Sequence, residues 1–187
     1  MEERQVTAEG KTYPLPQPFF VLATQNPLYQ VGTFPLPESQ LDRFLMCISL
    51  GYPDAAAERA LLMGDDRRSM LQQLASVMQV DELIAAQQAV KQIHCSAPLL
   101  DYLQKLLQET RRTGLFAAGL SPRAGLALLQ AARAWAGLEG RDHVIPEDLQ
   151  AVFIPVAAHR LHPLASNSGH TLSSQVLLSN LMKQIAL

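Results

Sequence analysis

The sequence of 187 residues predicts a mainly α-helical protein that begins with a short β-containing segment. The first sign is a change in composition near Tyr52-Pro53: proline, aromatic and β-branched residues are frequent before it, whereas Ala, Leu and Gln dominate after it. The second is a helix start at Ser121-Pro122, an N-cap residue followed by proline at the first helical position. The third is the helical apolar period between Pro98 and Thr110. We therefore divide the chain into residues 1–52 and an all-α part, residues 53–187.

The first predicted element is a hairpin from Gln5 to Tyr13, because Gly10 accepts the positive φ of a tight turn. The tripeptide Gly10-Lys11-Thr12 also resembles the end of a phosphate-binding loop. That loop requires a glycine where this chain has Gln5, and a following helix that Pro14 and Pro16 exclude. We interpret the tripeptide as part of the hairpin.

Two further strands and a short helix are expected before Tyr52. The unbroken apolar run Phe19–Ala23 is typical of a strand buried on both faces of a parallel sheet. Residues Glu38–Leu45 are expected to form a short helix and Cys47–Leu50 a short strand. Because a central strand needs partners on both sides, we expect the chain to self-associate or to leave its first part disordered. Proteolysis would then leave a fragment near residues 53–187.

The part after Tyr52 is predicted to be a series of helices with N-cap and proline start signals. The helix that begins after Ser121 should end at Gly140, since glycine is favoured just beyond a helix. Its buried stripe is expected to contain Leu128, Ala131, Trp135 and Leu138. The expected helices run from Asp54 to Met63, from Asp81 to Gln92, from Pro98 to Thr110, from Pro122 to Gly140, from Pro146 onward, and through Val176, Leu177, Leu181 and Ile185.

Charge and composition argue against several classes of function, a nucleic-acid-binding helical domain among them. The net charge is -2 and no run of Lys or Arg exceeds two residues, so the basic stripe of a nucleic-acid-binding domain is absent. Cys47 and Cys95 form no Cys-x-x-Cys pair and the histidines no His-Glu-x-x-His motif, so we expect no metal site. No segment is apolar enough to span a bilayer, and Met1–Arg4 is too charged for a signal peptide. We expect a soluble protein of a reducing cytoplasm, with no membrane span and no nucleic acid as partner.

Asn26 is the first candidate for binding a ligand. It lies in the polar stretch Thr24–Pro27, directly after the expected strand Phe19–Ala23. Ligands of open α/β sheets bind outside the carboxyl ends of strands, where an amide can orient a water or a phosphate oxygen. The alternative is that Asn26 only forms an Asx-type turn before Pro27.

Two arginines are candidates for binding a phosphate. Arg43 is expected to be held by a short helix between apolar neighbours. It could present its planar fork to a phosphate, or could instead pair with Asp42 or Glu38 at the surface. Arg123 lies in the first turn of the helix that begins at Pro122, where unpaired N–H groups attract anions. A positive charge there opposes the helix dipole, which indicates an anionic partner, although a surface salt bridge would explain it as well.

Together, these motifs resemble the MoxR family of AAA+ ATPases. Each motif is weak alone, but they occur in a plausible order and cover most of the chain. The resemblance is weakest from Asp65 to Ser76 and after Pro163. The stretches that carry it are Phe19–Pro27, Glu38–Met46, Gly51–Pro53, Ser121–Arg123, Arg141–Val144 with Pro146–Asp148, and His159–Leu161.

The resemblance implies a helical AAA+ lid, residues 53–187, preceded by a remnant of an αβα P-loop ATPase core, residues 1–52. It makes Asn26 the sensor 1 residue and Arg43 the arginine finger that reaches the nucleotide of a neighbouring subunit. It makes Arg123 the sensor 2 residue, acting on its own or on a neighbour's nucleotide. Family members form rings, hexamers above all, bind ATP and Mg, and act as chaperone-like factors in the bacterial cytoplasm.

The chain departs from the family because it contains neither the phosphate-binding loop nor the acidic motif that holds the metal. We therefore expect no ATP hydrolysis by this chain alone, and no tight binding of ATP or Mg to it. The expected function is that of the complete machine, ATP-driven maturation or remodelling of partner proteins whose identity the sequence leaves open. The alternative is a stand-alone helical interaction module without ATPase activity.

Overall fold

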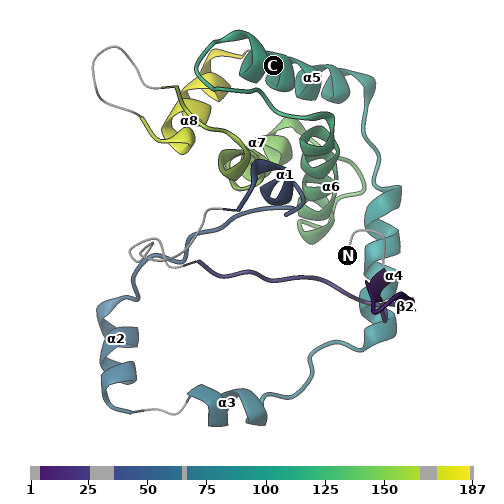
Figure 1. Cartoon of the computed structure of the whole chain (residues 1–187), viewed down its shortest axis with the longest axis vertical. Helices are drawn as coiled ribbons and strands as arrows, with labels where there is room; N and C mark the ends of the chain where they lie inside the picture. The colour runs from purple at the N-terminus through teal and green to yellow at the C-terminus, as the bar shows by residue number, and fades with distance from the viewer. Residues whose placement is uncertain (1–4, 26–35, 65–66, 165–171, 186–187) are drawn as a thin grey trace.

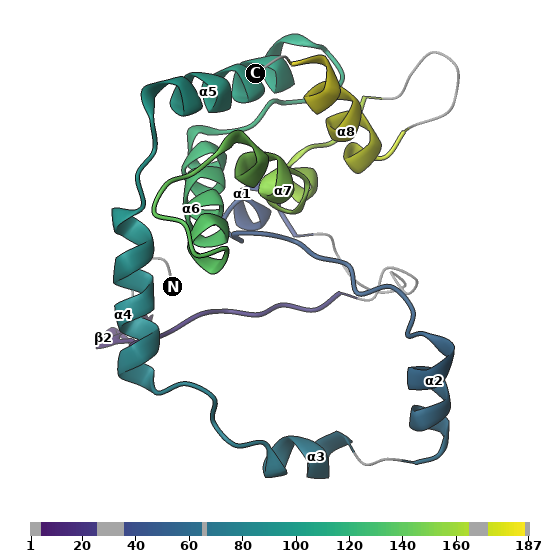
Figure 2. The same cartoon turned by 180° about the vertical axis from the view of Figure 1, so that it is seen from behind.

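The computed structural model describes residues 5–25, 36–64, 67–164 and 172–185. Within these ranges the protein is mainly α-helical, and its sheet has two strands. Figures 1 and 2 show helices α5 to α8 gathered at one end of the molecule, while α2 and α3 lie apart from them. The predicted fold class is therefore confirmed. Among the described residues, no helix combines the length and the apolar character needed to cross a membrane.

The N-terminal hairpin forms as expected. Strands β1 (Gln5–Ala8) and β2 (Lys11–Pro14) pair antiparallel, with Val6 opposite Tyr13. Glu9 and Gly10 form the turn with φ angles of 51° and 76°. Two positive φ values are the mark of the type I′ turn, whose twist matches that of the strands it joins.

The two further strands do not form in the described residues. Phe19–Ala23 and Cys47–Leu50 are extended but belong to no sheet, and Phe20 and Leu22 are each 80% exposed. A strand becomes buried only when neighbouring strands and covering helices supply the other surfaces, and the described residues supply none here. The expected burial of Phe19–Ala23 is therefore wrong.

The short helix near Arg43 is shorter than predicted. Helix α1 spans Glu38–Leu41, and residues up to Leu45 follow it as a turn instead of a continued helix. The amide of Arg43 donates to Gln40 O at 3.2 Å, and the amide of Phe44 donates to Leu41 O at 3.1 Å. These contacts close a tight turn that leaves the Arg43 side chain exposed.

Helices α2 (Ala55–Leu62) and α3 (Arg67–Gln73) form an arm away from the other helices (Figure 1). Asp54 caps α2 as predicted, since its Oδ1 accepts from the amide of Ala57 at 2.7 Å. No residue of α2 is buried. Helix α3 was not expected from the sequence.

Among the described residues, the buried hydrophobic core lies between Ile93 and Leu181. Helix α6 packs most extensively against α7, and α5 and α8 cover the same core. The helices that the sequence predicted in this part are all present. Their bounds are α4 (Val80–Gln92), α5 (Ala97–Arg112), α6 (Pro122–Leu138), α7 (Pro146–Ala157), the 3₁₀ turn η1 (Ala158–Arg160) and α8 (Ser174–Gln184).

The buried face of α6 differs from the predicted stripe in its second half. Leu128 and Ala131 are buried as expected, but Trp135 is 43% exposed and Leu138 84% exposed. Buried residues Ala132 and Ala136 replace them, so the stripe turns by about one residue around the helix. Small side chains on this face let neighbouring helices pack closely against α6, which larger side chains would prevent. The predicted burial of Trp135 and Leu138 is therefore wrong.

Helix α7 begins at an ion pair whose carboxylate, that of Asp148, is buried and whose arginine, Arg141, is partly exposed. Ile145 stands at the N-cap position without a side-chain acceptor, and Asp148 accepts from the Ile145 amide at 2.9 Å instead. Asp148 also accepts from both terminal nitrogens of Arg141, at 2.6 Å and 2.5 Å. Burial alone would raise the pKa of Asp148, but the hydrogen bonds and charge of Arg141, with the Ile145 amide, hold that pKa below its usual range.

Candidate functional site

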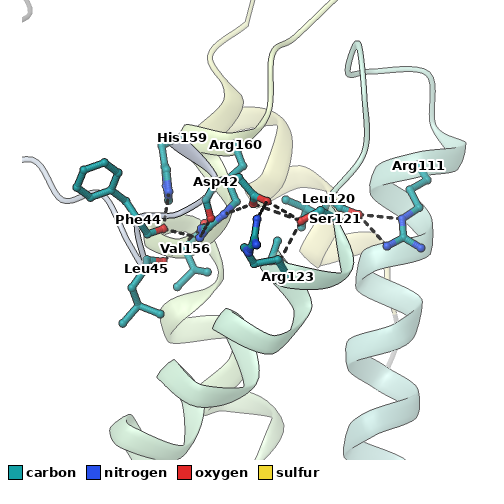
Figure 3. A network of polar contacts seen from close by, with 11 residues as sticks. Asp42, Phe44, Leu45, Arg111, Leu120, Ser121, Arg123, Val156, His159 and Arg160 are labelled. Carbon is teal, nitrogen blue, oxygen red and sulfur yellow. Dashed lines mark hydrogen bonds and ion pairs between the residues drawn. The ribbon is translucent and has the colours of Figure 1, made fainter. Parts of the chain in front are cut away.

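The candidate site is a polar junction between the turn after α1 and the helices α6 and α7. We call residues 42–45 the Arg43 turn. Figure 3 shows that side chains from α6 and η1 converge on this turn from segments far apart in sequence. Asp42 is the residue that contacts both segments.

Arg160 holds the Arg43 turn from the side of η1. Its side chain is only 4% exposed. The Nε donates to Asp42 Oδ1 at 3.0 Å, and the Nη2 donates to Asp42 O at 3.2 Å and to Phe44 O. The Nη1 donates to Leu45 O at 3.2 Å and to Val156 O in the preceding turn of its own segment. The guanidinium thereby uses all five of its N–H donors.

The Asp42 carboxylate joins the turn to the N-terminus of α6. Ser121 Oγ lies 3.2 Å and 3.1 Å from the two carboxylate oxygens. Arg123 Nη1 lies 3.7 Å from Asp42 Oδ2. A single carboxylate therefore links Arg160, Ser121 and Arg123, and it is only partly exposed to solvent (Figure 3).

The N-terminus of α6 is in turn fixed by α5. The Ser121 hydroxyl caps α6 by accepting from the amide of Ala124 at 3.1 Å. Directly before it, the Leu120 carbonyl accepts from Arg111 Nε at 2.9 Å and from Arg111 Nη2 at 2.8 Å. The Leu120 amide donates to Thr110 Oγ1 at 3.1 Å. Both backbone groups of the residue before the cap are thus held, so the start of α6 has a defined position.

Gly119 allows this close approach of the two segments. A Cβ atom on Gly119 would lie 2.3 Å from Arg111 Cγ and 2.7 Å from Arg111 Cα. A backbone atom cannot move away as a flexible side chain can. A side chain at position 119 would therefore push the loop before Ser121 off α5.

The electrostatics of the junction follow from burial. Burial lowers the pKa of Arg160, while the hydrogen bond and charge of Asp42 oppose that effect. Burial also lowers the pKa of His159 below 6.5, and the neighbouring Arg160 charge adds to the shift. His159 Nε2 donates to Phe44 O at 3.2 Å, which the neutral ring does with its Nε2–H tautomer. The His159 ring is therefore favoured in its neutral form.

The space at the junction is small. A hollow of about 190 Å³ is lined by α1, the loop before α6 and η1. Cofactor sites usually occupy roughly 300–1,000 Å³, so the described residues at the junction do not enclose a nucleotide by themselves. The described part of the chain also contains no group of three or more His, Cys, Asp or Glu residues placed to hold a metal ion.

Two of the three candidate residues lie at the junction. Arg43 follows Asp42 directly in the turn, and Arg123 contacts the Asp42 carboxylate. The surface salt bridge that we considered for Arg123 is thus present, with Asp42 as its anion. Asn26 lies outside the described residues. The roles given to all three stay predictions.

The residues that organise the junction were not candidates from the sequence. Asp42 was considered only as a partner for Arg43, and Arg160 only as part of a family motif. The sequence does place Arg160 within one turn after the apolar helix that ends at Ala157. A cation at the end of a helix usually only complements the helix dipole, so this position alone did not mark Arg160 as a site residue. Nothing local showed that its acceptors lie more than a hundred residues earlier in the chain.

Comparison with known proteins identifies the two parts of the chain separately. Residues 1–46 match the model of the ATPase family associated with various cellular activities (AAA). Residues 108–177 match the model of the AAA lid domain.

The curated relatives include MoxR proteins. The chain is 37% identical to the uncharacterized protein YeaC of Bacillus subtilis over 99% of its own length and 58% of YeaC. It is 34% identical to chaperone MoxR1 of Mycobacterium tuberculosis over its full length and 52% of that protein. It is also 34% identical to protein MoxR of Methylorubrum extorquens, covering 86% of this chain and 52% of that protein. The chain thus spans about half the length of the curated relatives it matches.

A crystal structure of a proposed ATPase from Cytophaga hutchinsonii has a similar fold. It matches with a TM-score of 0.88 and 30% identity, over 99% of this chain and 59% of that one. The match includes the arm formed by α2 and α3, since nearly the whole chain is covered.

Proposed function

The chain belongs to the MoxR-type AAA+ ATPases, and from this premise we propose that it supplies the arginine finger and the helical lid of an ATP-driven, chaperone-like machine. The observation that carries the proposal is the shared carboxylate of Asp42. It joins the turn that presents Arg43 to the first turn of α6, which presents Arg123. Two guanidinium groups at one junction suit the charge of a nucleotide's phosphates.

Arg43 acts, in this proposal, on a nucleotide held by a neighbouring subunit. Its side chain is exposed, and the hollow beside it is too small for a nucleotide. A finger that completes a neighbour's site explains both properties, and it requires subunits arranged in a ring, which we propose to be a hexamer. Arginine fingers raise rates by roughly 10³–10⁵ through stabilising charge in the transition state.

Arg123 acts on the same nucleotide as Arg43. Both side chains start close to one carboxylate, because Arg43 adjoins Asp42 in sequence and Arg123 lies 3.7 Å from it. A phosphate within reach of one guanidinium is then close to the other. We therefore assign both arginines to the site of the neighbouring subunit.

The remaining features of the proposal follow from the family. The machine binds ATP and Mg, uses Asn26 as sensor 1, and remodels or matures a client protein in the bacterial cytoplasm. A second candidate is a helical interaction module without ATPase activity, favoured by the exposed apolar side chains of the arm, Leu62 and Leu71 among them.

The first experiment measures the mass of the native protein by immunoblot of source-cell extract. A band heavier than 20.5 kDa favours a larger ATPase that includes this chain, and a band at 20.5 kDa favours the interaction module. The second measures ATP hydrolysis by the protein purified from those cells. We expect Arg43→Ala to lower kcat by roughly 10³-fold or more. Arg112→Ala is the matched control, since Arg112 is 75% exposed on α5 and its ion pair is with Glu109.

Mixing two variants tests the assignment of Arg123. If both arginines serve the neighbour's site, every site in mixed rings of Arg43→Ala and Arg123→Ala subunits lacks one of them, and the mixture stays inactive. If Arg123 serves its own subunit, an Arg43→Ala site beside an Arg123→Ala neighbour has both arginines, and activity returns. Recovered hydrolysis on mixing contradicts the assignment.

A further inference from the structure

We propose that Arg160 is a positioning residue for Arg43: it fixes the backbone on both sides of the finger and attaches it to the end of α7. This inference rests on the proposed function, because it presupposes that Arg43 is the finger. It adds a residue to which no role in the reaction has been given so far.

The contacts of Arg160 surround the peptide units of Arg43. One nitrogen, Nη2, donates to Asp42 O and to Phe44 O, the carbonyls of the residues that precede and follow Arg43. The neighbouring Nε donates to the Asp42 side chain, and Nη1 donates to Leu45 O. Because a guanidinium is planar and rigid, these acceptors are held in one fixed arrangement.

Additional contacts attach the same segment to the end of α7. His159 Nε2 donates to Phe44 O at 3.2 Å. The amide of Cys47 donates to Pro155 O at 2.9 Å. The chain from 42 to 47 is thus held along its length by residues 155–160, so the Arg43 backbone must move with α7.

The fold itself does not require this attachment. None of residues 42–47 belongs to the hydrophobic core or packs against it as a partly buried apolar side chain. Four of the five acceptors of Arg160 nevertheless lie in the Arg43 turn. A buried charge is costly unless it is fully paired, so this arrangement is better explained by accurate placement of the turn than by stability.

The experiment compares Arg160→Lys, Arg43→Ala and the double variant in the protein purified from its source cells. A lysine keeps the charge but lacks the planar fork, and a misplacement of about 1 Å can lower a rate by roughly 10²-fold. We expect Arg160→Lys to lower kcat between tenfold and a hundredfold as an order of magnitude, with KM for ATP nearly unchanged. The double variant should be no slower than Arg43→Ala, because a misplaced finger and an absent finger affect the same step.

Val152→Ala is the control for a loss of stability alone. Val152 is a buried core residue of α7, so its truncation weakens the same helix without touching the turn. It should lower Tm and leave kcat unchanged. Hydrogen exchange of the 187-residue chain supplies a second readout: in Arg160→Lys the amides of residues 42–47 should exchange faster, while those of α5 keep the parent rate. If Arg160→Lys prevents folding, Asp42→Asn tests the same attachment, with its backbone carbonyl retained.

The outcomes separate the inference from the function on which it rests. If Arg43→Ala has no effect on hydrolysis, the proposed function is wrong and the inference goes with it. If Arg43→Ala abolishes hydrolysis but Arg160→Lys has the kcat of the parent, only the positioning role is overturned. A multiplicative loss in the double variant, or unchanged exchange at residues 42–47, also overturns it.

Discussion

Helices α2 and α5 begin in the same way but differ in what surrounds them. Asp54 caps α2 and Ser96 caps α5, each by accepting from the amide three residues later. Five residues of α5 are buried, whereas α2 has none. Local capping therefore specifies where a helix starts, and only packing partners decide whether its apolar side chains are buried.

The same difference separates the arm, α2 and α3, from the helical bundle, α5 to α8. The bundle contains the described core, and the arm presents apolar residues such as Leu62 and Leu71 to solvent. Isolated helices shorter than about 12 residues are marginal in water, and α2 has eight residues. The arm should accordingly open far more often than the bundle in this chain.

Limited proteolysis should show the largest difference. Arg59 of α2 and Lys105 of α5 are both exposed basic residues within helices, so trypsin can recognise each of them. Cleavage after Lys105 requires opening of the bundle, which costs several kcal/mol, so we expect cleavage after Arg59 to be on the order of a thousandfold faster. Mass spectrometry of timed digests measures the ratio. Similar rates at both sites would mean that the arm is as well protected as the bundle.

Truncating one leucine in α5 and one in α2 compares how much each helix contributes to the free energy of unfolding. Leu106 of α5 is 0% exposed and Leu62 of α2 is 83% exposed. Leu106→Ala should lower the free energy of unfolding by about 2–5 kcal/mol, because it leaves a cavity in the core. Leu62→Ala should change it by less than about 0.5 kcal/mol. Urea unfolding followed by circular dichroism measures both; a large loss in Leu62→Ala would show that the arm is packed in solution.

Loss of the ion pair between Arg141 and Asp148 at the start of α7 should have an intermediate effect on stability. Asp148→Asn leaves Arg141 without its carboxylate, and we expect a loss of about 1–3 kcal/mol at neutral pH. Asp142→Asn is the matched control, since Asp142 is 98% exposed in the same connection, and it should leave stability unchanged.

The pH dependence of this ion pair has a defined sign. Because the folded state lowers the pKa of Asp148 below 3.8, its stabilisation is complete above that pH and is lost as the pH falls through the lowered pKa. The parent and Asp148→Asn should therefore converge in stability under acid. A constant difference between them down to low pH would contradict the assignment.

The smallest expected effect is the pH dependence contributed by His159. Its pKa in the folded state lies below 6.5, so the unfolded chain takes up a proton first as the pH falls through that value. Stability should decline below about pH 6.5, and His159→Gln, which can still donate to Phe44 O, should remove that part of the decline. Urea midpoints at pH 7.5 and 5.5 measure this decline in stability. An equal fall of the midpoint in parent and variant would exclude His159 as the cause.

Much of the helical part was predictable because its signals are local. Capping residues such as Asp54 and Ser121 and the glycine after α6 specify helix ends within one turn of chain. The buried stripe of α6 was predicted only in part, because the helices that pack around α6 decide which side chains are buried, and these include Ala132 and Ala136. The expected strand at Phe19–Ala23 failed for the same reason, since burial of a strand depends on its neighbours. The division of the chain near Tyr52 stays a prediction.

By itself, the sequence predicted the family resemblance, the starts of most helices after Tyr52 and the candidates Arg43 and Arg123. It could do so because motifs, caps and hairpin turns are read over a few neighbouring residues. Only the tertiary structure decided that Asp42 lies between Arg160, about a hundred and twenty residues later in the chain, and Arg123, about eighty residues later. A polar side chain has many acceptable partners in a sequence, and the folded backbone alone selects which of them are within hydrogen-bonding distance.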